Sequence, residues 1–289
     1  MDERLASPGG DDPDRETEKR GREGAGKGAT VSGSVELEID GPVAVITNVN
    51  DEKHNAFDDD MDAQLFTILA ELKARPDVRA VVWRGEGRSF SSGRDVGSIG
   101  TNQTELTHHE LMRRGHRGIQ ALWELDAPVL VACKGWVMGG SFQRALLCDV
   151  RVAAEGTRFR LPELTHGVIP DTGGVAVLHQ MCGPGVVSDL VLTGRIVEAE
   201  EALTLGIVSR VVAPEELDAT VRAMAEQVAT TPAVTVKLAR MVIAHLARPA
   251  VRASMDDELI YQTFLNRSDD FAEYRAARGE DRPPRYRGS

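Results

Sequence analysis

The sequence predicts an α/β fold that is followed by a region built only of helices. Two observations carry this prediction. Short apolar segments of strand character alternate with helical segments as far as Val212, and the pattern from Pro214 to Arg278 is helical. Such alternation is typical of α/β proteins. Each short strand returns after one or two helices, so the pattern fits a spiral of repeated turns as well as a flat sheet.

The first ordered elements are a hairpin and a helix. Residues 35–39 alternate apolar and polar side chains, Asp40-Gly41 marks a turn, and the apolar run 43–47 follows. This is the signal of a β-hairpin. Carboxylates at 58–60 then mark a helix start, apolar residues recur at the helical period, and Pro76 ends the helix.

A glycine pair at the centre of the chain is the first candidate for a functional site. The run 129–133 predicts a buried strand, and 142–148 predicts a buried helix. Between them, Gly139 and Gly140 leave backbone N–H groups open to a ligand, because no Cβ blocks the approach. N–H groups at a helix start suit a developing oxyanion. A tight turn without a ligand fits this stretch equally well.

The other elements are predicted from the spacing of apolar residues and from the glycines and prolines that interrupt it. A short strand is expected at 80–83, and a loop of small residues follows at 89–95. Further strands are expected at 150–153 and 208–212, and helices up to 181, at 186–192 and at 198–205. The C-terminal helices are expected to break near Pro232 and Pro249.

Composition limits the class of protein. The 289 residues carry a formal net charge of -11, which argues against nucleic acid or an anionic membrane as a partner. Three cysteines in apolar contexts without CxxC spacing indicate reduced thiols of a cytoplasmic protein. Apolar runs stay short of the roughly 20 residues of a membrane span. Residues 1–33 hold almost no large apolar side chains, so we expect a disordered tail.

Five segments in a fixed order carry a family resemblance. They are Lys53 to Ala56, Phe90 to Asp95, Gly135 to Asp149, Phe159 to Gly174, and Leu192 to Val208. With them the chain resembles the crotonase, or enoyl-CoA hydratase/isomerase, superfamily from about Val35 onward. The resemblance implies a ββα spiral core over 34–213, a helical trimerisation region over 214–289, an acyl-CoA substrate and a homotrimer or dimer of trimers.

The resemblance also assigns roles at the site. The backbone N–H groups of Arg94 and Gly140 would form an oxyanion hole for the thioester carbonyl, and losing one such donor typically costs about 10²–10³ in rate. The side chains of Lys53 and Arg94 are candidates to pair with CoA phosphates. Ser141 and Phe142 would shape the acyl cavity. The full set matched to substrate binding is Lys53, Asn55, Ala56, Ser92, Gly93, Gly139, Ser141 and Gln143.

The acid and base positions depart from the hydratases of this family. Those enzymes use two glutamates, and the resemblance places the second on Glu163 and the first on Gln143. An amide does not transfer protons at neutral pH. What remains is Glu163 with Asp171, a pair that also occurs in the family's isomerases and thioester hydrolases. Asp171 fits a cap on the following helix equally well.

These residues favour an isomerase that shifts a double bond in an enoyl-CoA, with Glu163 as the base. A hydrolase of 3-hydroxyacyl-CoA, a hydratase with one glutamate and a CoA-ester binding protein without turnover stay open. No metal and no cofactor beyond the CoA of the substrate is implied. His108, His109 and His116 lack a metal-binding pattern, and His166 is a candidate to line the pocket. Tyr274 and Arg278 are candidates to reach a neighbouring subunit's CoA site.

Overall fold

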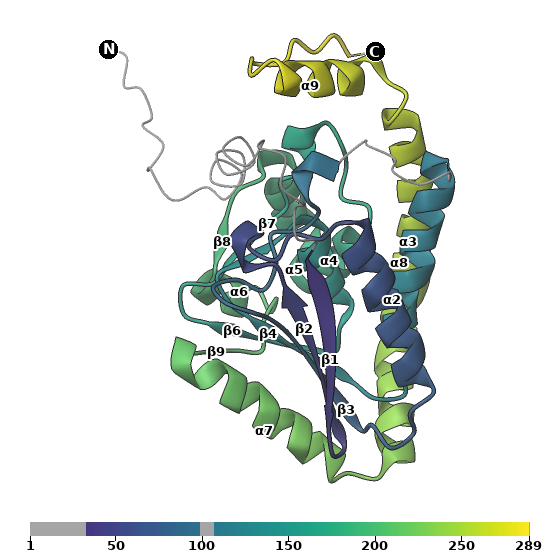
Figure 1. Cartoon of the computed structure of the whole chain (residues 1–289), viewed down its shortest axis with the longest axis vertical. Helices are drawn as coiled ribbons and strands as arrows, with labels where there is room; N and C mark the ends of the chain where they lie inside the picture. Colours follow the sequence, from purple (N-terminus) through teal and green to yellow (C-terminus); the bar gives the residue numbers. More distant parts are fainter. Residues whose placement is uncertain (1–32, 99–106, 289) are drawn as a thin grey trace. The chain divides into compact units, whose positions relative to one another are not determined.

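The computed structural model describes residues 33–98 and 107–288 (Figure 1). The predicted tail lies outside the described residues except for Gly33, and so does the segment 99–106. The described residues form two β-sheets with helices packed around them. Between β4 and β9, strands of the large sheet and the small sheet are followed by helices, and this ββα repeat confirms the predicted spiral core.

The large sheet has six strands in the order β1-β2-β3-β4-β6-β9. Only the β1–β2 pair is antiparallel, and it forms the predicted hairpin with Asp40 opposite Val43. The remaining neighbours run parallel, as expected for strands joined by helical crossovers. The strands are β1 Ser34–Asp40, β2 Val43–Val49, β3 Ala80–Gly85, β4 Val129–Cys133, β6 Val150–Ala154 and β9 Arg210–Val212.

The small sheet was not predicted as a separate layer. It consists of β5 Trp136–Met138, β7 Arg158–Arg160 and β8 Val197–Glu198, in the order β5-β7-β8. Segments of two or three residues are too short to show a hydrophobic period. Strand β5 matters for function because it leads directly into the glycine pair.

Both faces of the inner strands of the large sheet are buried, and alternate strand residues face different helices. Val45, Val82 and Leu130 share one apolar cluster with Leu217 and Val221 of α7. The side chains that point the other way join the main core with α2, α3, α4 and α5. A strand buried on both faces is therefore apolar throughout, which is why β4 reads as a continuous apolar run.

The helices agree with the predicted segments, with two exceptions that the next paragraphs describe. The helices of the described residues are α2 Asp59–Lys73, α3 His108–Glu124, α4 Gly139–Leu147, α5 Gly174–Thr193, α6 Ala199–Thr204, α7 Leu217–Ala229, α8 Ala233–Leu265 and α9 Asp269–Gly279, with 3-10 turns η1 Asp51–Lys53, η2 Val96–Ser98, η3 Glu163–His166 and η4 Pro214–Glu216. As expected, Asp58 caps α2, because its carboxylate accepts from the Met61 N–H.

The first exception concerns the expectation that apolar segments stay shorter than a membrane span, because α5 has the length and apolar composition of such a span. Gly183 has non-helical φ and ψ, and Pro184 follows it, so α5 consists of two shorter helices that meet at a kink. It packs against α4 and α8, and we interpret it as a helix of a globular core.

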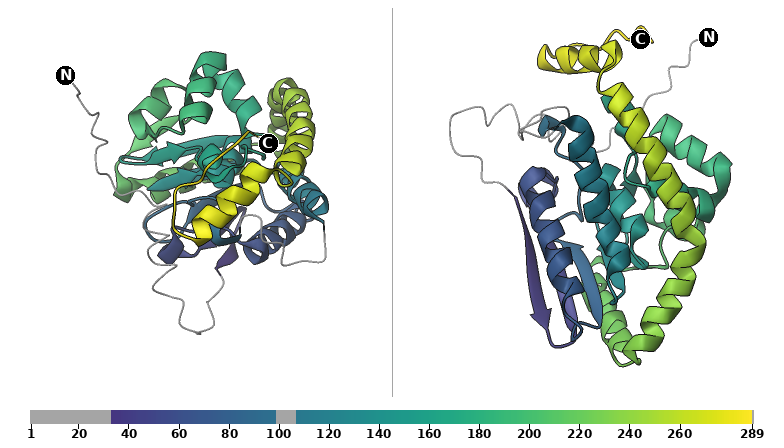
Figure 2. Two further views of the ribbon diagram at one scale, coloured as in Figure 1. Left: turned by 90° about the horizontal axis from the view of Figure 1, so that it is seen from above. Right: turned by 90° about the vertical axis from the view of Figure 1, so that its right-hand side faces the viewer.

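The second exception is α8, because the predicted break at Pro249 is wrong. The helix runs 33 residues through this proline. A proline inside a helix removes one backbone hydrogen bond but does not prevent the helix where packing holds it. Figure 2 shows α8 running along the domain, with α7 near its start and α9 beyond its end.

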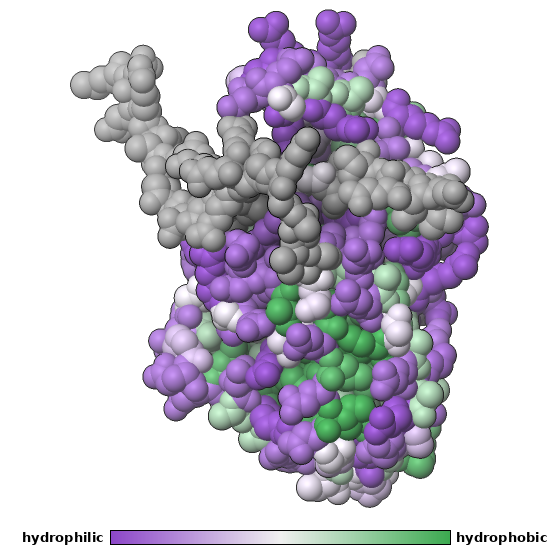
Figure 3. All heavy atoms as spheres, viewed as in Figure 1, coloured by the Kyte–Doolittle hydropathy of each residue, from purple (hydrophilic) through white to green (hydrophobic). Residues whose placement is uncertain are grey.

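Apolar side chains also remain exposed. On the face in Figure 3, apolar residues gather over β1 and α2 within a polar surround. The larger exposed set lies on α8, where Leu246 is 82% exposed. The exposed apolar residues of α8 are Val234, Leu238, Met241, Val242, Ile243, Leu246, Ile260, Tyr261 and Phe264.

Candidate active site

Two backbone segments meet at the glycine pair. The loop before Arg94 pairs with β5, since the Met138 N–H donates to the Ser91 carbonyl at 3.0 Å. Gly93 then adopts a φ of +93°, and a Cβ there would lie 2.8 Å from the carbonyl oxygen of Met138. The same Cβ would lie 3.5 Å from the Cα of Gly139. Only a residue without a side chain allows this approach.

The predicted oxyanion donors lie on these two segments. Gly139 has a φ of +51° and begins α4, so the Gly140 N–H belongs to the first helical turn and has no partner within the helix. Arg94 directly follows Gly93 and is held by the bridge to Phe57. The structure therefore brings the segments of Arg94 and Gly140 into contact, as an oxyanion hole requires.

Glu163 lies beside this junction. It is the first residue of η3 and is 8% exposed. A Cβ built on Gly139 would lie 3.5 Å from its Oε1 atom. The same Oε1 accepts a hydrogen bond from Nε2 of Gln143 at 2.9 Å. A carboxylate held at the edge of two oxyanion donors is placed to move a proton next to a bound thioester.

The surrounding backbone fixes the orientation of Gln143. Its Oε1 accepts from the N–H groups of Thr172 at 2.9 Å and Gly174 at 3.4 Å. Because those donors require an oxygen, the amide nitrogen must face Glu163. A Cβ on Gly174 would lie 2.5 Å from Cγ of Gln143, so this turn also needs a glycine. Gln143 thus links the α5 turn to the carboxylate of Glu163.

Asp171 lies in the same turn but does not cap α5. The N-cap of α5 is Gly173, which makes no side-chain cap, so the alternative role of Asp171 as a helix cap is wrong. Its carbonyl accepts from His116 Nε2 at 2.7 Å, and its carboxylate lies 3.5 Å from Thr172 Oγ1. Burial raises the pKa of Asp171, although the positive charges of His116, Arg144 and Arg94 oppose this effect.

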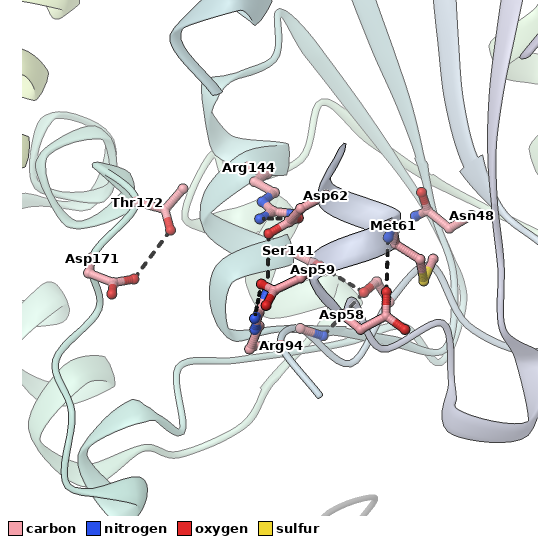
Figure 4. A network of polar contacts seen from close by, with 12 residues as sticks. Asn48, Asp58, Asp59, Met61, Asp62, Arg94, Ser141, Arg144, Asp171 and Thr172 are labelled. Carbon is pink, nitrogen blue, oxygen red and sulfur yellow. Dashed lines mark hydrogen bonds and ion pairs between the residues drawn. The ribbon is translucent and has the colours of Figure 1, made fainter. Parts of the chain in front are cut away.

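The side chain of Arg94 has a different partner from the predicted CoA phosphate. Its guanidinium pairs with Asp59 at 2.5 Å and with Asp62 at 3.1 Å, both on α2 (Figure 4). Asp62 also pairs with Arg144 of α4 at 2.8 Å. The side chain of Arg94 therefore anchors its own loop to α2, and its expected contribution to catalysis stays with the backbone N–H.

The residues matched to CoA binding mostly shape the loop around them. Asn55 is fully buried, and its amide bonds to backbone atoms of Asn50, Glu86 and Ser89. Ala56 is 2% exposed, and its carbonyl accepts from Asn50. These two residues can act on a ligand only through the loop they form.

Three further predicted residues also have partners within the protein. Lys53 pairs with Asp95 at 2.7 Å while its side chain stays 42% exposed. The Ser92 hydroxyl donates to the Lys53 carbonyl at 3.0 Å. Ser141 shares a buried hydrogen bond of 2.7 Å with Ser91. Lys53 is thus an accessible positive charge near the site, where a phosphate would have to compete with Asp95.

Two other predicted residues contact side chains within the protein. Phe142 packs in the core, with its ring 5.2 Å from that of Phe159, and its role at the acyl cavity stays a prediction. The ring of His166 bonds to the hydroxyl of Tyr274 at 3.0 Å. Arg278 donates to the same hydroxyl at 3.1 Å, so α9 holds η3 of its own chain.

The C-terminal helix α8 holds the α5 turn from the other side. Glu258 accepts from the Gly173 N–H at 2.9 Å, and Gln262 accepts from the Ile169 N–H at 3.2 Å. Ser254 donates to the second oxygen of Glu258 at 2.7 Å. Burial raises the pKa of Glu258 to about 7. The turn that orients Gln143 therefore depends on Glu258, which lies 85 positions from Gly173 in the sequence.

Sequence reasoning missed the roles of Asp62, Arg144 and Glu258 and left His116 without one. Arg144 had a visible signal, because it is a charge inside an apolar run that was expected to be buried. Glu258 had no such signal in the sequence, since a glutamate on a long helix is normally solvated. In the described ranges, no group of three His, Cys, Asp or Glu side chains could hold a metal ion.

Comparison with known proteins then decides the family. A model of the enoyl-CoA hydratase/isomerase family matches residues 38–289. The chain belongs to the enoyl-CoA hydratase/isomerase family. Crystal structures agree with this assignment. An enoyl-CoA hydratase/isomerase of Pseudoalteromonas atlantica superposes with a TM-score of 0.79 at 29% identity, over 88% of this chain and 100% of the other.

Curated members of the enoyl-CoA hydratase/isomerase family are similar in sequence. The carnitinyl-CoA dehydratase of Salmonella typhi is 35% identical over 198 residues, which are 68% of this chain and 75% of the relative. The short-chain-enoyl-CoA hydratase of Clostridium acetobutylicum is 32% identical over 211 residues, or 73% of this chain and 80% of the relative. This chain is an enzyme of the family that acts on acyl-CoA.

Proposed function

We propose that the enzyme shifts a double bond in an enoyl-CoA through an enolate. The N–H groups of Arg94 and Gly140 hold the thioester oxygen and stabilise the negative charge that develops there. Glu163 removes a proton from one carbon of the conjugated system and returns it to another. The placement of Glu163 beside Gly139, with an amide in place of a second carboxyl group, carries this proposal.

Gln143 is the reason for preferring isomerisation to hydration. Hydration by two carboxyl groups needs one to deprotonate water and one to protonate carbon. Gln143 cannot exchange a proton, and both ends of its amide are already bonded to Glu163 and to the α5 turn. Isomerisation needs one base that acts twice, and Glu163 supplies it.

Replacement of Glu163 by glutamine tests this role. Glu163→Gln keeps the shape of the side chain and removes its ability to accept a proton, so turnover should fall by about 10²–10⁴. Glu155→Gln, at an exposed turn, is the matched control and should keep full turnover. Turnover of enoyl-CoA esters is measured by chromatography. Full activity in Glu163→Gln would refute the role of this base.

Hydration or dehydration is the second candidate, and the names of the relatives favour it. The two curated relatives are named as a dehydratase and a hydratase, which does not support the isomerase preference. With Gln143, such a reaction has to run on Glu163 alone. Oxygen-18 from labelled water enters the acyl chain in hydration and stays out of the product in isomerisation, so the label separates the two candidates.

We also propose that the enzyme assembles as a homotrimer or a dimer of trimers through α8. The exposed apolar residues of this helix, such as Val242 at 70% and Leu246 at 82%, are one turn apart and share a face. Contiguous apolar surface of this kind usually marks an interface between proteins. A second copy of the same chain is the partner that the family resemblance implies.

A further inference from the structure

Arg144 is a charge buried next to the reacting centre. Its side chain is 10% exposed and lies in the buried helix α4, between Gln143 and the apolar residues 145–147. Nη2 is 2.8 Å from Asp62, and the guanidinium lies 4.9 Å from the ring centre of Phe57. Within the described part of the chain, its Nε and Nη1 atoms have no hydrogen-bond partner. Leaving such buried donors unpaired costs stability unless a ligand or water accepts from them.

The position of Arg144 places it on the acyl side of the site. It lies four residues after Gly140, so both face the same side of α4, and helical side chains lean towards the N-terminus. The carboxylate of Asp62 joins it to Arg94, whose backbone supplies the other oxyanion donor. Asp171 is close enough to feel its charge. Arg144 thus lies on the side of α4 that carries Gly140, with Asp62 and Phe57 beside its guanidinium.

The charges around Arg144 leave room for an oxygen acceptor. Asp59 and Asp62 pair with Arg94 and Arg144, and Asp58 adds a further negative charge that acts on Arg94, so the ion pairs themselves are balanced and one further carboxylate faces Arg94. The Arg144 charge also acts on Asp171, and burial favours the neutral form of that carboxyl. A hydrocarbon chain would leave the Nε and Nη1 donors unpaired, whereas an oxygen on the acyl group would accept from them.

We propose that Arg144 recognises an oxygen acceptor on the acyl group, so that preferred substrates carry a carboxylate or hydroxyl beyond the reacting carbons. This rests on the proposed function in one respect: the acyl group must lie beside Glu163. A guanidinium is well suited to the task, because it binds carboxylates with two donors and also donates to neutral oxygens. Arg144 is here a specificity residue and takes no part in proton transfer.

The test compares acyl-CoA esters of equal chain length that end in methyl, hydroxyl or carboxylate. Binding of saturated esters is measured by calorimetry, and turnover is measured separately with the matching enoyl esters. We expect at least one oxygen-bearing ester to bind about 10- to 100-fold more tightly than the methyl ester. Arg144→Leu should abolish this preference, and Arg144→Lys should retain part of it. The salt dependence distinguishes carboxylate from hydroxyl, since only the charged contact weakens with ionic strength.

Two results would overturn the proposal. One is a wild-type enzyme that binds the methyl ester as tightly as both oxygen-bearing esters, and the other is a preference that survives in Arg144→Leu. If Arg144→Leu fails to fold because Asp62 loses a partner, the Asp62→Asn/Arg144→Leu variant removes that charge and gives the same comparison. Preferential binding without turnover of any ester would support Arg144 while refuting the proposed isomerase.

Discussion

Changing Gln143 to glutamate should convert the site to one with two carboxyl groups. In the structure, Nε2 of Gln143 donates to Glu163 Oε1 at 2.9 Å, and its Oε1 accepts from the Thr172 and Gly174 N–H groups. A glutamate has the same length, so one oxygen keeps the two backbone donors. The other oxygen then faces the Glu163 carboxylate, and the two groups repel each other when both are ionised.

The strength of the repulsion between the two carboxylates of Gln143→Glu follows from the distance between their charges. Two carboxylates whose charges are ~4 Å apart repel by about 4 kcal/mol at an effective dielectric constant of about 20. This repulsion separates the two apparent pKa values of the pair by about 3. The pair therefore keeps a single proton over a wide pH range, which supplies an acid and a base at once. We expect Gln143→Glu to hydrate enoyl-CoA about 10²-fold or more faster than the wild type.

The assay is incorporation of oxygen-18 from labelled water into the acyl chain, followed across pH. Gln143→Leu is the control, since it removes the amide without adding a carboxyl group and should gain no hydration. The pH–rate profile of Gln143→Glu should show an ionisation that the wild type lacks. The reasoning is refuted if Gln143→Glu folds but incorporates no more oxygen-18 than the wild type and shows no new ionisation in its pH–rate profile. The amide at position 143 would then not explain why hydration is slow.

Two further predictions concern pH and assembly. The pKa of Glu258 is raised from 4.5 to about 7, so the unfolded chain releases this proton first, and stability should fall as pH rises from about 5 to 7, by on the order of 3 kcal/mol. Urea unfolding of Glu258→Gln should lack this fall relative to the wild type, and an equal fall in both would contradict the assignment. Leu246→Glu places a charge on the apolar face of α8 and should shift sedimentation towards monomer, whereas exposed Glu155→Gln should not. A wild-type monomer would refute the proposed assembly.

Local signals were enough to predict much of the fold. The hairpin at Asp40-Gly41, the Asp58 cap of α2 and the apolar run of β4 each depend on residues near one another in sequence. Strand β5 was missed because three residues carry no period. Pro249 was misjudged because the packing that keeps α8 continuous is a tertiary effect.

The candidate site was predictable where backbone conformation decides it. Gly93 and Gly139 have positive φ and approach each other closely, and such positions are visible in sequence as glycines. The partners of side chains were not predictable in the same way. Arg94 turned out to bind α2, and Glu258 reaches the α5 turn from a distant helix. Those contacts depend on how helices pack, which no local pattern records.

The most direct test of the central claim follows the product of one turnover by mass spectrometry in oxygen-18 water. Wild-type enzyme and Glu163→Gln are incubated with a panel of enoyl-CoA esters, and products are separated by chromatography. Isomerisation by a single base predicts a product of unchanged mass and altered retention with the wild type, and none with Glu163→Gln. Label in the acyl chain of the wild-type product, or label in a released acid, would contradict isomerisation by a single base.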